Sequence, residues 1–219
     1  MQLPFSRSEF LDVFGAYNAA LWPGAAALWL VSLALSLSLV KTGRAPHRAL
    51  SVLLAVHWGW SAIAYHAVFF STINPAARVF AVMFLAEALL FLWLGVFRRR
   101  LRFSAEPSAW HVLAGVLVLY ALAYPFLVLA EGLAYPRTPT FGVPCPSTIL
   151  TIGLLSTAES LPWSIAIVPL LWAGIGGSAA FLLGVHADLM LVAGAFLLIA
   201  SLLRRVPGTK PRAQSRARL

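Results

Sequence analysis

The sequence predicts an all-α fold: a transmembrane bundle of about seven helices, preceded by a short amphipathic helix. Hydrophobic residues make up 61% of the 219 positions and charged residues only 11%, whereas a soluble domain carries about 25% charged residues. The few charges are clustered, which leaves apolar runs of about twenty residues, the length that crosses about 30 Å of hydrocarbon. We therefore expect one membrane domain over residues 1–203, followed by a basic tail over residues 204–219.

The first half of the chain is predicted to contain an interfacial helix and three spans. Ser6 or Ser8 followed by Glu9 is a helix start signal, and apolar residues then recur at helical spacing up to Leu21. We expect the three spans at about residues 20–40, 49–70 and 75–97. The short segment STINP joins the last two spans, and Asn74 within it can cap the third. These two spans should therefore form a tight antiparallel hairpin.

The second half is predicted to contain four further helices. We expect them at about residues 109–130, 142–158, 162–184 and 186–203. Pro125 should kink the outer third of the first of these helices. The third contains the small-residue segment GIGGSAAFLLG. Close helix packing explains such a segment, and a hinge for alternating access is the alternative.

Lys and Arg are concentrated in three segments, which predicts the orientation of the bundle. Residues 41–48, 98–102 and 204–218 hold thirteen of the sixteen, and cationic residues of this kind mark cytoplasmic loops. The first two segments are two spans apart, and the tail joins them on the same side only if an even number of further spans intervenes. The four helices expected in the second half meet this condition. We therefore expect seven spans, with the N-terminus outside and the C-terminus in the cytoplasm, and anionic lipids at the basic segments.

Residues 131–151, EGLAYPRTPTFGVPCPSTILT, differ from the rest of the chain because they contain four prolines and the only cysteine. The apolar run that follows, about 147–158, has twelve residues, or about 18 Å of helix, too short to cross a membrane alone. Either residues 141–146 enter the membrane as non-helical backbone, or the bilayer is thinned there. Such backbone must be covered by protein or line a wet cavity. We therefore expect the loop 131–147 to fold into the mouth of the bundle.

Several polar side chains are expected to converge at this outer mouth. The expected binding set is His66, Arg137, Cys145, Thr148, His186 and Asp188. Free N–H groups at the start of the fifth helix would suit an anion or a polar solute. Alternatively, the thiol and imidazole groups of Cys145, His66 and His186 would suit a soft metal ion. Without any ligand, Ser147 or Thr148 would cap a helix and the histidines would bind backbone carbonyls.

Two ionisable residues are expected deeper in the membrane. Glu87 lies about eleven residues from the basic end of its span, where a charged carboxylate costs about 2.5–3.5 kcal/mol. His57 lies about eight residues from the basic end of the preceding span. Because these two spans form a hairpin, we expect His57 to contact Glu87. The pair would either bind a proton or link the two helices as neutral groups.

The same residues exclude two cofactors and one class of partner. Neither Lys41 nor Lys210 lies in an expected span, which excludes a retinal Schiff base. His57 and His66 are nine residues apart, so they face opposite directions and cannot hold a haem between them. Any other cofactor stays unknown. Cations that flank membrane helices account for the net charge of +9, so no nucleic acid partner is expected.

Three segments carry a resemblance to a known family: AYHAVFFSTINPAA, YPRTPTFGVPCPST and LWAGIGGSAAFLLGVHADL, with TPTFGVPCP the most distinctive part. Over nearly the whole chain, the sequence resembles a bacterial family of integral-membrane proteins known only as a domain of unknown function. The resemblance implies a helical bundle in a bacterial inner membrane. It assigns no catalytic or binding residues to this chain.

These observations predict an inner-membrane protein that binds or transports a small solute or ion through the outer mouth, with proton uptake by Glu87. One alternative is an accessory or assembly subunit of a membrane complex, with a membrane-protein partner or a second copy of the chain. Another is a membrane enzyme with Cys145 as nucleophile. A cysteine nucleophile needs a neighbouring base, and no local motif provides one, so whether the chain is an enzyme stays open.

Overall fold

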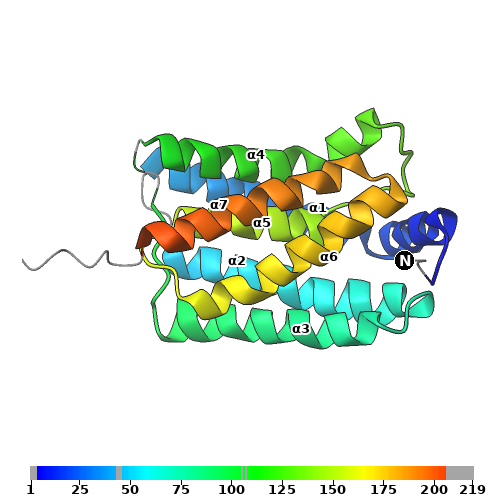
Figure 1. The fold of residues 1–219 in the computed structure, drawn as a ribbon, viewed down its shortest axis with the longest axis horizontal. Helices are drawn as coiled ribbons and strands as arrows, with labels where there is room; N and C mark the ends of the chain where they lie inside the picture. Colours follow the sequence, from blue (N-terminus) through cyan, green and yellow to red (C-terminus); the bar gives the residue numbers. More distant parts are fainter. Residues whose placement is uncertain (1–3, 43–45, 105, 107, 206–219) are drawn as a thin grey trace, which may run out of the picture.

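The computed structural model describes residues 4–42, 46–104, 106 and 108–205, and over these ranges it shows seven α-helices along one long axis (Figure 1). They are α1 (Arg7–Thr42), α2 (His47–Trp60), α3 (Ala77–Leu90), α4 (Ala109–Ala130), α5 (Pro144–Ser156), α6 (Ile167–Leu183) and α7 (Met190–Arg205). The predicted all-α bundle is confirmed. The predicted basic tail lies outside the described residues from position 206 onward.

Short helical segments extend four of these helices. They are η1 (Ser61–Phe69) and η2 (Phe70–Thr72) after α2, η3 (Phe91–Phe97) after α3, η4 (Trp163–Ala166) before α6 and η5 (His186–Leu189) before α7. With these extensions, six helices in the described ranges are long and apolar enough to cross a membrane. They coincide with six of the seven predicted spans. The seventh, α5, is shorter.

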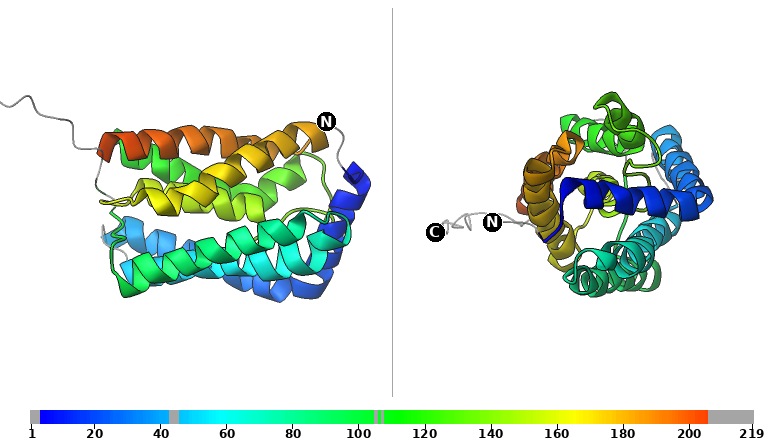
Figure 2. Two further views of the ribbon diagram at one scale, coloured as in Figure 1. Left: turned by 60° about the horizontal axis from the view of Figure 1, so that its bottom comes forward. Right: turned by 90° about the vertical axis from the view of Figure 1, so that its right-hand side faces the viewer.

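The first part of α1 lies across one end of the bundle, and the rest runs along it (Figure 2). The helix begins with two reciprocal bonds: the Glu9 N–H donates to Ser6 Oγ (3.2 Å), and the Ser6 N–H donates to the Glu9 carboxylate (2.7 Å). The helix start expected here is confirmed, but the amphipathic helix is not separate from the first span. Instead α1 continues to Thr42 with Pro23 inside it, a residue that bends a helix without always ending it.

Helix α5 occupies the centre of the bundle. Twelve of its thirteen residues are buried, and it contacts α2, α4, α6 and α7. The end-on view in Figure 2 shows it inside a ring formed by the longer helices. At 1.5 Å per residue it is about 20 Å long. Because protein surrounds it, this helix needs neither the length nor the lipid-facing surface of a peripheral span.

The chain enters the bundle as non-helical backbone just before α5. This is the first of the two alternatives predicted from the sequence, the other being a thinned bilayer. Phe141, Gly142 and Val143 are buried and precede the helix. Side chains satisfy their carbonyl groups: the Tyr17 hydroxyl donates to Phe141 O (2.8 Å), and the Ser61 hydroxyl donates to Gly142 O (2.6 Å). The helix itself begins at residue 144 rather than near 147, since proline suits the first turn of a helix.

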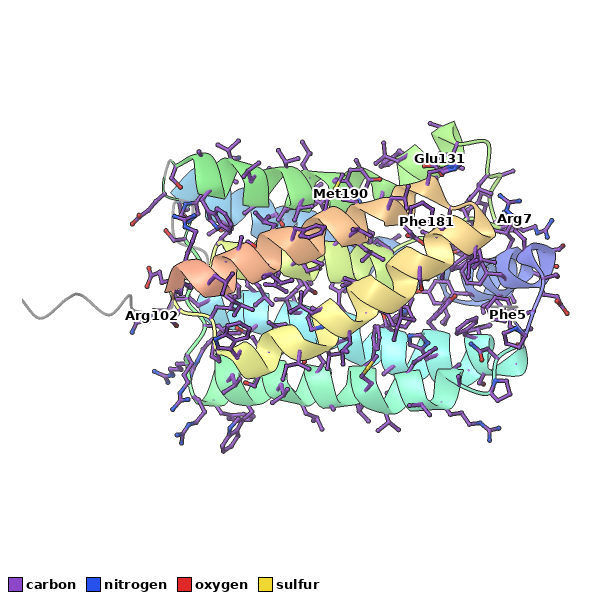
Figure 3. The ribbon with its side chains drawn as sticks, viewed as in Figure 1. Phe5, Arg7, Arg102, Glu131, Phe181 and Met190 are labelled. Carbon is purple, nitrogen blue, oxygen red and sulfur yellow. The ribbon has the colours of Figure 1, made fainter. Side chains whose placement is uncertain are left out.

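The described residues of the three basic segments meet at one end of the bundle, here called the basic end. The Phe103 N–H donates to His47 Nδ1 (3.1 Å), the Glu159 N–H donates to Arg102 O (2.8 Å), and Arg205 donates to Ser156 O (3.1 Å). Figure 3 shows Arg102 at this end, and Phe5, Arg7 and Glu131 at the opposite, distal end.

Candidate functional site

A cavity of about 340 Å³ lies at the distal end of the bundle. The first part of α1, the hairpin of α2 and α3, the start of α5 and the distal half of α6 all contribute to its walls. Most of the lining side chains are apolar or aromatic, and Cys145, Trp172 and Asp188 bring polar atoms together on its inner side. We call this space the distal cavity.

Cys145, Trp172 and Asp188 line the inner side of the cavity, and Tyr124 lies behind Asp188. We call these four residues the polar floor. The Tyr124 hydroxyl donates a hydrogen bond to the Asp188 carboxylate. The Cys145 thiol interacts with Asp188 and with the Trp172 indole. Gly176 makes room for this group, because a Cβ there would lie 3.2 Å from Trp172 Nε1 and 3.6 Å from Cys145 Sγ. The sequence therefore brings α4, α5, α6 and η5 together at one polar centre.

Trp172 on the floor and His66 beside it have hydrogen-bonding groups without a strong partner. Within the described part of the chain, neither ring nitrogen of His66 has a hydrogen-bond partner, and the Trp172 N–H has only a weak contact with the Cys145 thiol. Both side chains are buried, and their ring centroids are 5.1 Å apart. The Phe84 ring completes the cluster, 4.7 Å from His66 and 4.9 Å from Trp172. Buried polar atoms nearly always have a partner, and a thiol is only a weak acceptor. These groups can therefore bind a ligand without first losing a strong internal hydrogen bond.

Glu87 and Thr148 continue this set of groups toward the basic end. Glu87 follows Phe84 by one turn of α3, and Thr148 follows Cys145 by one turn of α5. Both are fully buried. Neither carboxylate oxygen of Glu87 nor the Thr148 hydroxyl has a hydrogen-bond partner among the residues described. Unused polar groups thus extend from the cavity toward the middle of the bundle.

The structure corrects the expected pairing of His57 with Glu87. One ring nitrogen of His57 is 2.9 Å from Ser32 Oγ on α1, and the other is 2.9 Å from Ser147 Oγ on α5. Both nitrogens are therefore occupied by helices outside the α2–α3 hairpin. His57 links three helices, and the expected hydrogen bond to Glu87 is not formed. Hairpin neighbours share a contact surface, but side-chain direction decides which groups on that surface meet.

Arg137 and His186, two members of the expected binding set, lie away from the polar floor. The Arg137 guanidinium forms an ion pair with Asp12 (2.8 Å) and donates to Ser8 Oγ (2.9 Å), so it fastens the loop to α1. His186 is exposed at the start of η5. In the described ranges, no group of three or more His, Cys, Asp and Glu side chains is placed to hold a metal ion. The structure does bring Cys145 together with Asp188, as expected.

The chemistry of the floor disfavours an anion. Pro144 and Pro146 have no N–H groups, and the Ser147 N–H donates to Val143 O (3.4 Å), so the start of α5 offers few donors. The Asp188 carboxylate also lies on the floor. A molecule that accepts a hydrogen bond from Trp172 and donates one to Asp188 would match the groups present.

Tyr124 and Trp172 are site residues that sequence reasoning missed. Each lies inside a long apolar run and resembles the aromatic residues that pack in any membrane helix. Tyr124 directly precedes Pro125, within α4, and this is the only local signal that distinguishes it. Their role becomes visible only when α4 and α6 are placed beside α5.

A comparison with protein families gives one match, to a family of unknown function (DUF6064), and this match covers residues 7–210. It agrees with the resemblance seen in the sequence. No curated protein and no solved structure matches the chain.

Proposed function

We propose a ligand-binding function for this chain, which belongs to the DUF6064 family of unknown function and therefore takes no assigned activity from it. Six helices in the described ranges are long and apolar enough to cross a membrane, which supports a membrane location. In this proposal it binds, and in the fuller form transports, a small molecule in the distal cavity. The observation that carries the proposal is the polar floor, where the Trp172 N–H has only the Cys145 thiol as a weak partner and Cys145 in turn contacts Asp188.

The size and lining of the cavity support this proposal. Its volume of about 340 Å³ falls within the range of about 300–1,000 Å³ that small-molecule sites occupy. Such sites are mostly apolar, with a few convergent polar groups that orient the ligand. The distal cavity has this composition, because apolar and aromatic side chains form most of its walls and polar groups occupy one side.

The proposal also includes an orientation in a bacterial inner membrane, which is based on the positive charge of the basic end. Arg98, Arg99, Arg100 and Arg102 lie at the basic end, and cationic residues mark the cytoplasmic side of a bacterial inner membrane. The distal cavity would then open on the non-cytoplasmic side, with the N-terminus outside. The arginines would contact anionic lipids of the cytoplasmic leaflet.

Glu87 supplies a proton-binding step in this proposal. Its carboxyl group is fully buried and has no hydrogen-bond partner in the ranges described. A charged carboxylate is costly at this depth, and intramembrane carboxyl groups of this kind often take part in proton relays. Proton uptake here would be linked to ligand binding in the cavity, whose lining residue Phe80 lies about two turns of α3 away.

Replacing Glu87 with Gln is expected to remove the pH dependence of ligand binding and to leave folding intact, because the amide has nearly the same shape but cannot take up a proton. The measurement is the ligand-induced increase in thermal stability between pH 5 and pH 9. Asp188→Asn is the matched control, because it makes the same change from acid to amide at the carboxyl group on the polar floor. An unchanged pH profile in Glu87→Gln would remove the proton role from Glu87.

The proposed function is tested by a thermal-stability panel on the detergent-purified protein. The additives are monovalent ions, soft and hard divalent metals, anions, uncharged polar solutes and lipids. A ligand at a hundred times its dissociation constant stabilises by about 2.7 kcal/mol. We expect at least one uncharged polar compound to do so, and we expect Trp172→Phe to weaken the shift, since it keeps the ring but removes the N–H.

Trp58→Phe is the matched control. The Trp58 N–H donates to Thr151 Oγ1 (2.9 Å) and lies outside the cavity lining, so this variant should be less stable yet keep the full ligand shift. A panel in which no compound stabilises the protein would overturn the proposed function. A response to anionic lipids alone would do the same and would favour an accessory subunit.

A further inference from the structure

We infer that the distal cavity takes an amphipathic molecule with one apolar chain and an uncharged, hydroxyl-bearing head group, which enters from the lipid between α3 and α6. This inference rests on the proposed function and specifies its ligand. It depends on three features of the cavity: a closed roof, an open side and the polar floor.

Aromatic rings close the cavity toward the distal water phase. Phe5 and Phe10 stack with ring centroids 5.9 Å apart, and both meet the ring of Phe70, at 5.5 and 6.0 Å. Next to them, Arg7 Nε donates to Leu183 O (2.8 Å) and fastens the start of α1 to the end of α6. All three phenylalanines line the cavity. A polar solute from the water would have to pass this apolar roof.

The side of the cavity between α3 and α6 is continuous with the lipid-facing surface. Helix α6 crosses the bundle obliquely, close to α3 at the basic end and farther from it at the distal end (Figure 1). Ile175 and Leu182 on α6 line the cavity, yet they are 38% and 55% exposed. Ser178 and Ala179 lie between them on the helix, and their small side chains leave this side of the cavity open. An apolar chain can therefore lie in the cavity and extend into the bilayer.

The floor determines the head group. Trp172 offers an N–H without a strong partner, and the Asp188 carboxylate accepts hydrogen bonds. A hydroxyl group can both accept from Trp172 and donate to Asp188. A carboxylate or phosphate would instead face Asp188 with like charge. The cavity volume of about 340 Å³ suits a single chain and a small head group.

Cys145 provides a test of the route, because it is the only cysteine in the chain and lines the cavity. Its alkylation is followed in phosphatidylcholine vesicles with N-ethylmaleimide and with a charged, membrane-impermeant maleimide of similar size. We expect the uncharged reagent to react at least tenfold faster in the folded protein, and both reagents to react equally after denaturation. Equal rates in the folded protein would overturn access from the lipid while leaving the proposed function intact.

A pair of α6 variants locates the route. Ala179→Leu fills the side opening and should slow the uncharged reagent several-fold. Gly174→Leu adds the same side chain on the same helix, where no atom lies within 4 Å of the added Cβ, and should leave the rate unchanged. Equal slowing by both variants, or by neither, would contradict a route between α3 and α6.

The head group is tested with two single-chain probes of equal chain length, monoolein and oleate, added to the purified protein. We expect monoolein to raise the unfolding temperature and oleate to have no effect. Stabilisation by oleate but not monoolein would overturn the uncharged head group. If neither lipid acts but a water-soluble compound in the panel does, the amphipathic ligand is wrong and the proposed function stands. If nothing acts, the proposed function fails as well.

Discussion

Replacing Gly142 with Ala is expected to destabilise the protein by about 3 kcal/mol. The backbone of Gly142 has a φ of +82°, and a side chain in the left-handed region costs about 1–2 kcal/mol. An added Cβ would also lie 2.6 Å from the Trp60 ring and 2.6 Å from the Tyr17 hydroxyl. These two groups are hydrogen-bonded to each other (2.7 Å) and cannot separate freely, and overpacking of this kind costs about 1–3 kcal/mol.

Gly132→Ala separates the cost of the left-handed backbone from the cost of overpacking. Gly132 has a φ of +89°, but nothing lies within 4 Å of an added Cβ, so this variant should lose only the backbone part, about 1–2 kcal/mol. Both variants are compared by unfolding in mixed micelles. Equal losses in the two variants would mean that the space around Gly142 is not restrictive, and that the chain does not enter the bundle as described.

His57→Phe is expected to cost about 2 kcal/mol more than His66→Phe. Both changes keep a buried ring and remove two nitrogens. At His57 they remove hydrogen bonds to Ser32 and Ser147, each worth about 0.6 kcal/mol on average within a membrane. The Ser147 hydroxyl is also left without that partner, at a cost of about 1–3 kcal/mol. At His66 no hydrogen bond within the described structure is lost.

The two variants make the same His→Phe change at buried positions. Effects of this change that do not depend on hydrogen bonding therefore cancel when their losses of unfolding free energy are compared. It is measured by the same unfolding titration, together with the ligand shift of each variant. His57→Phe should keep the ligand shift in the molecules that fold. Equal stability losses at the two sites would contradict the assignment of His57 as a structural link between α1, α2 and α5.

Local signals in the sequence were enough to predict most of the helices. The Ser6–Glu9 capping pair and the short STINP turn each depend on neighbouring residues, and each occurs in the structure as a helix boundary. The shortness of the fifth helix, with proline-rich backbone before it, correctly indicated non-helical chain inside the bundle. Lipid selects long apolar runs, so their positions are visible without knowledge of packing.

Helix packing was harder to predict, because it depends on which faces meet. Both nitrogens of His57 are taken by Ser32 and Ser147, which lie 25 and 90 positions away in the chain. Tyr124 reaches Asp188 across 64 positions. Apolar residues surround most helices of a membrane bundle, so hydrophobic periodicity does not show the inward face as it does in soluble proteins. The central place of α5 therefore had no clear sequence signal.

The most direct test of ligand binding in the distal cavity is protection of Cys145 from alkylation by the compound that stabilises the protein most. At a hundred times its dissociation constant, about one site in a hundred is free, so the alkylation rate should fall about a hundredfold in the folded protein. Trp172→Phe should lose this protection at the same concentration of compound. An unchanged alkylation rate, with the stability increase still present, would place the ligand elsewhere and contradict the assignment of the polar floor as its binding site.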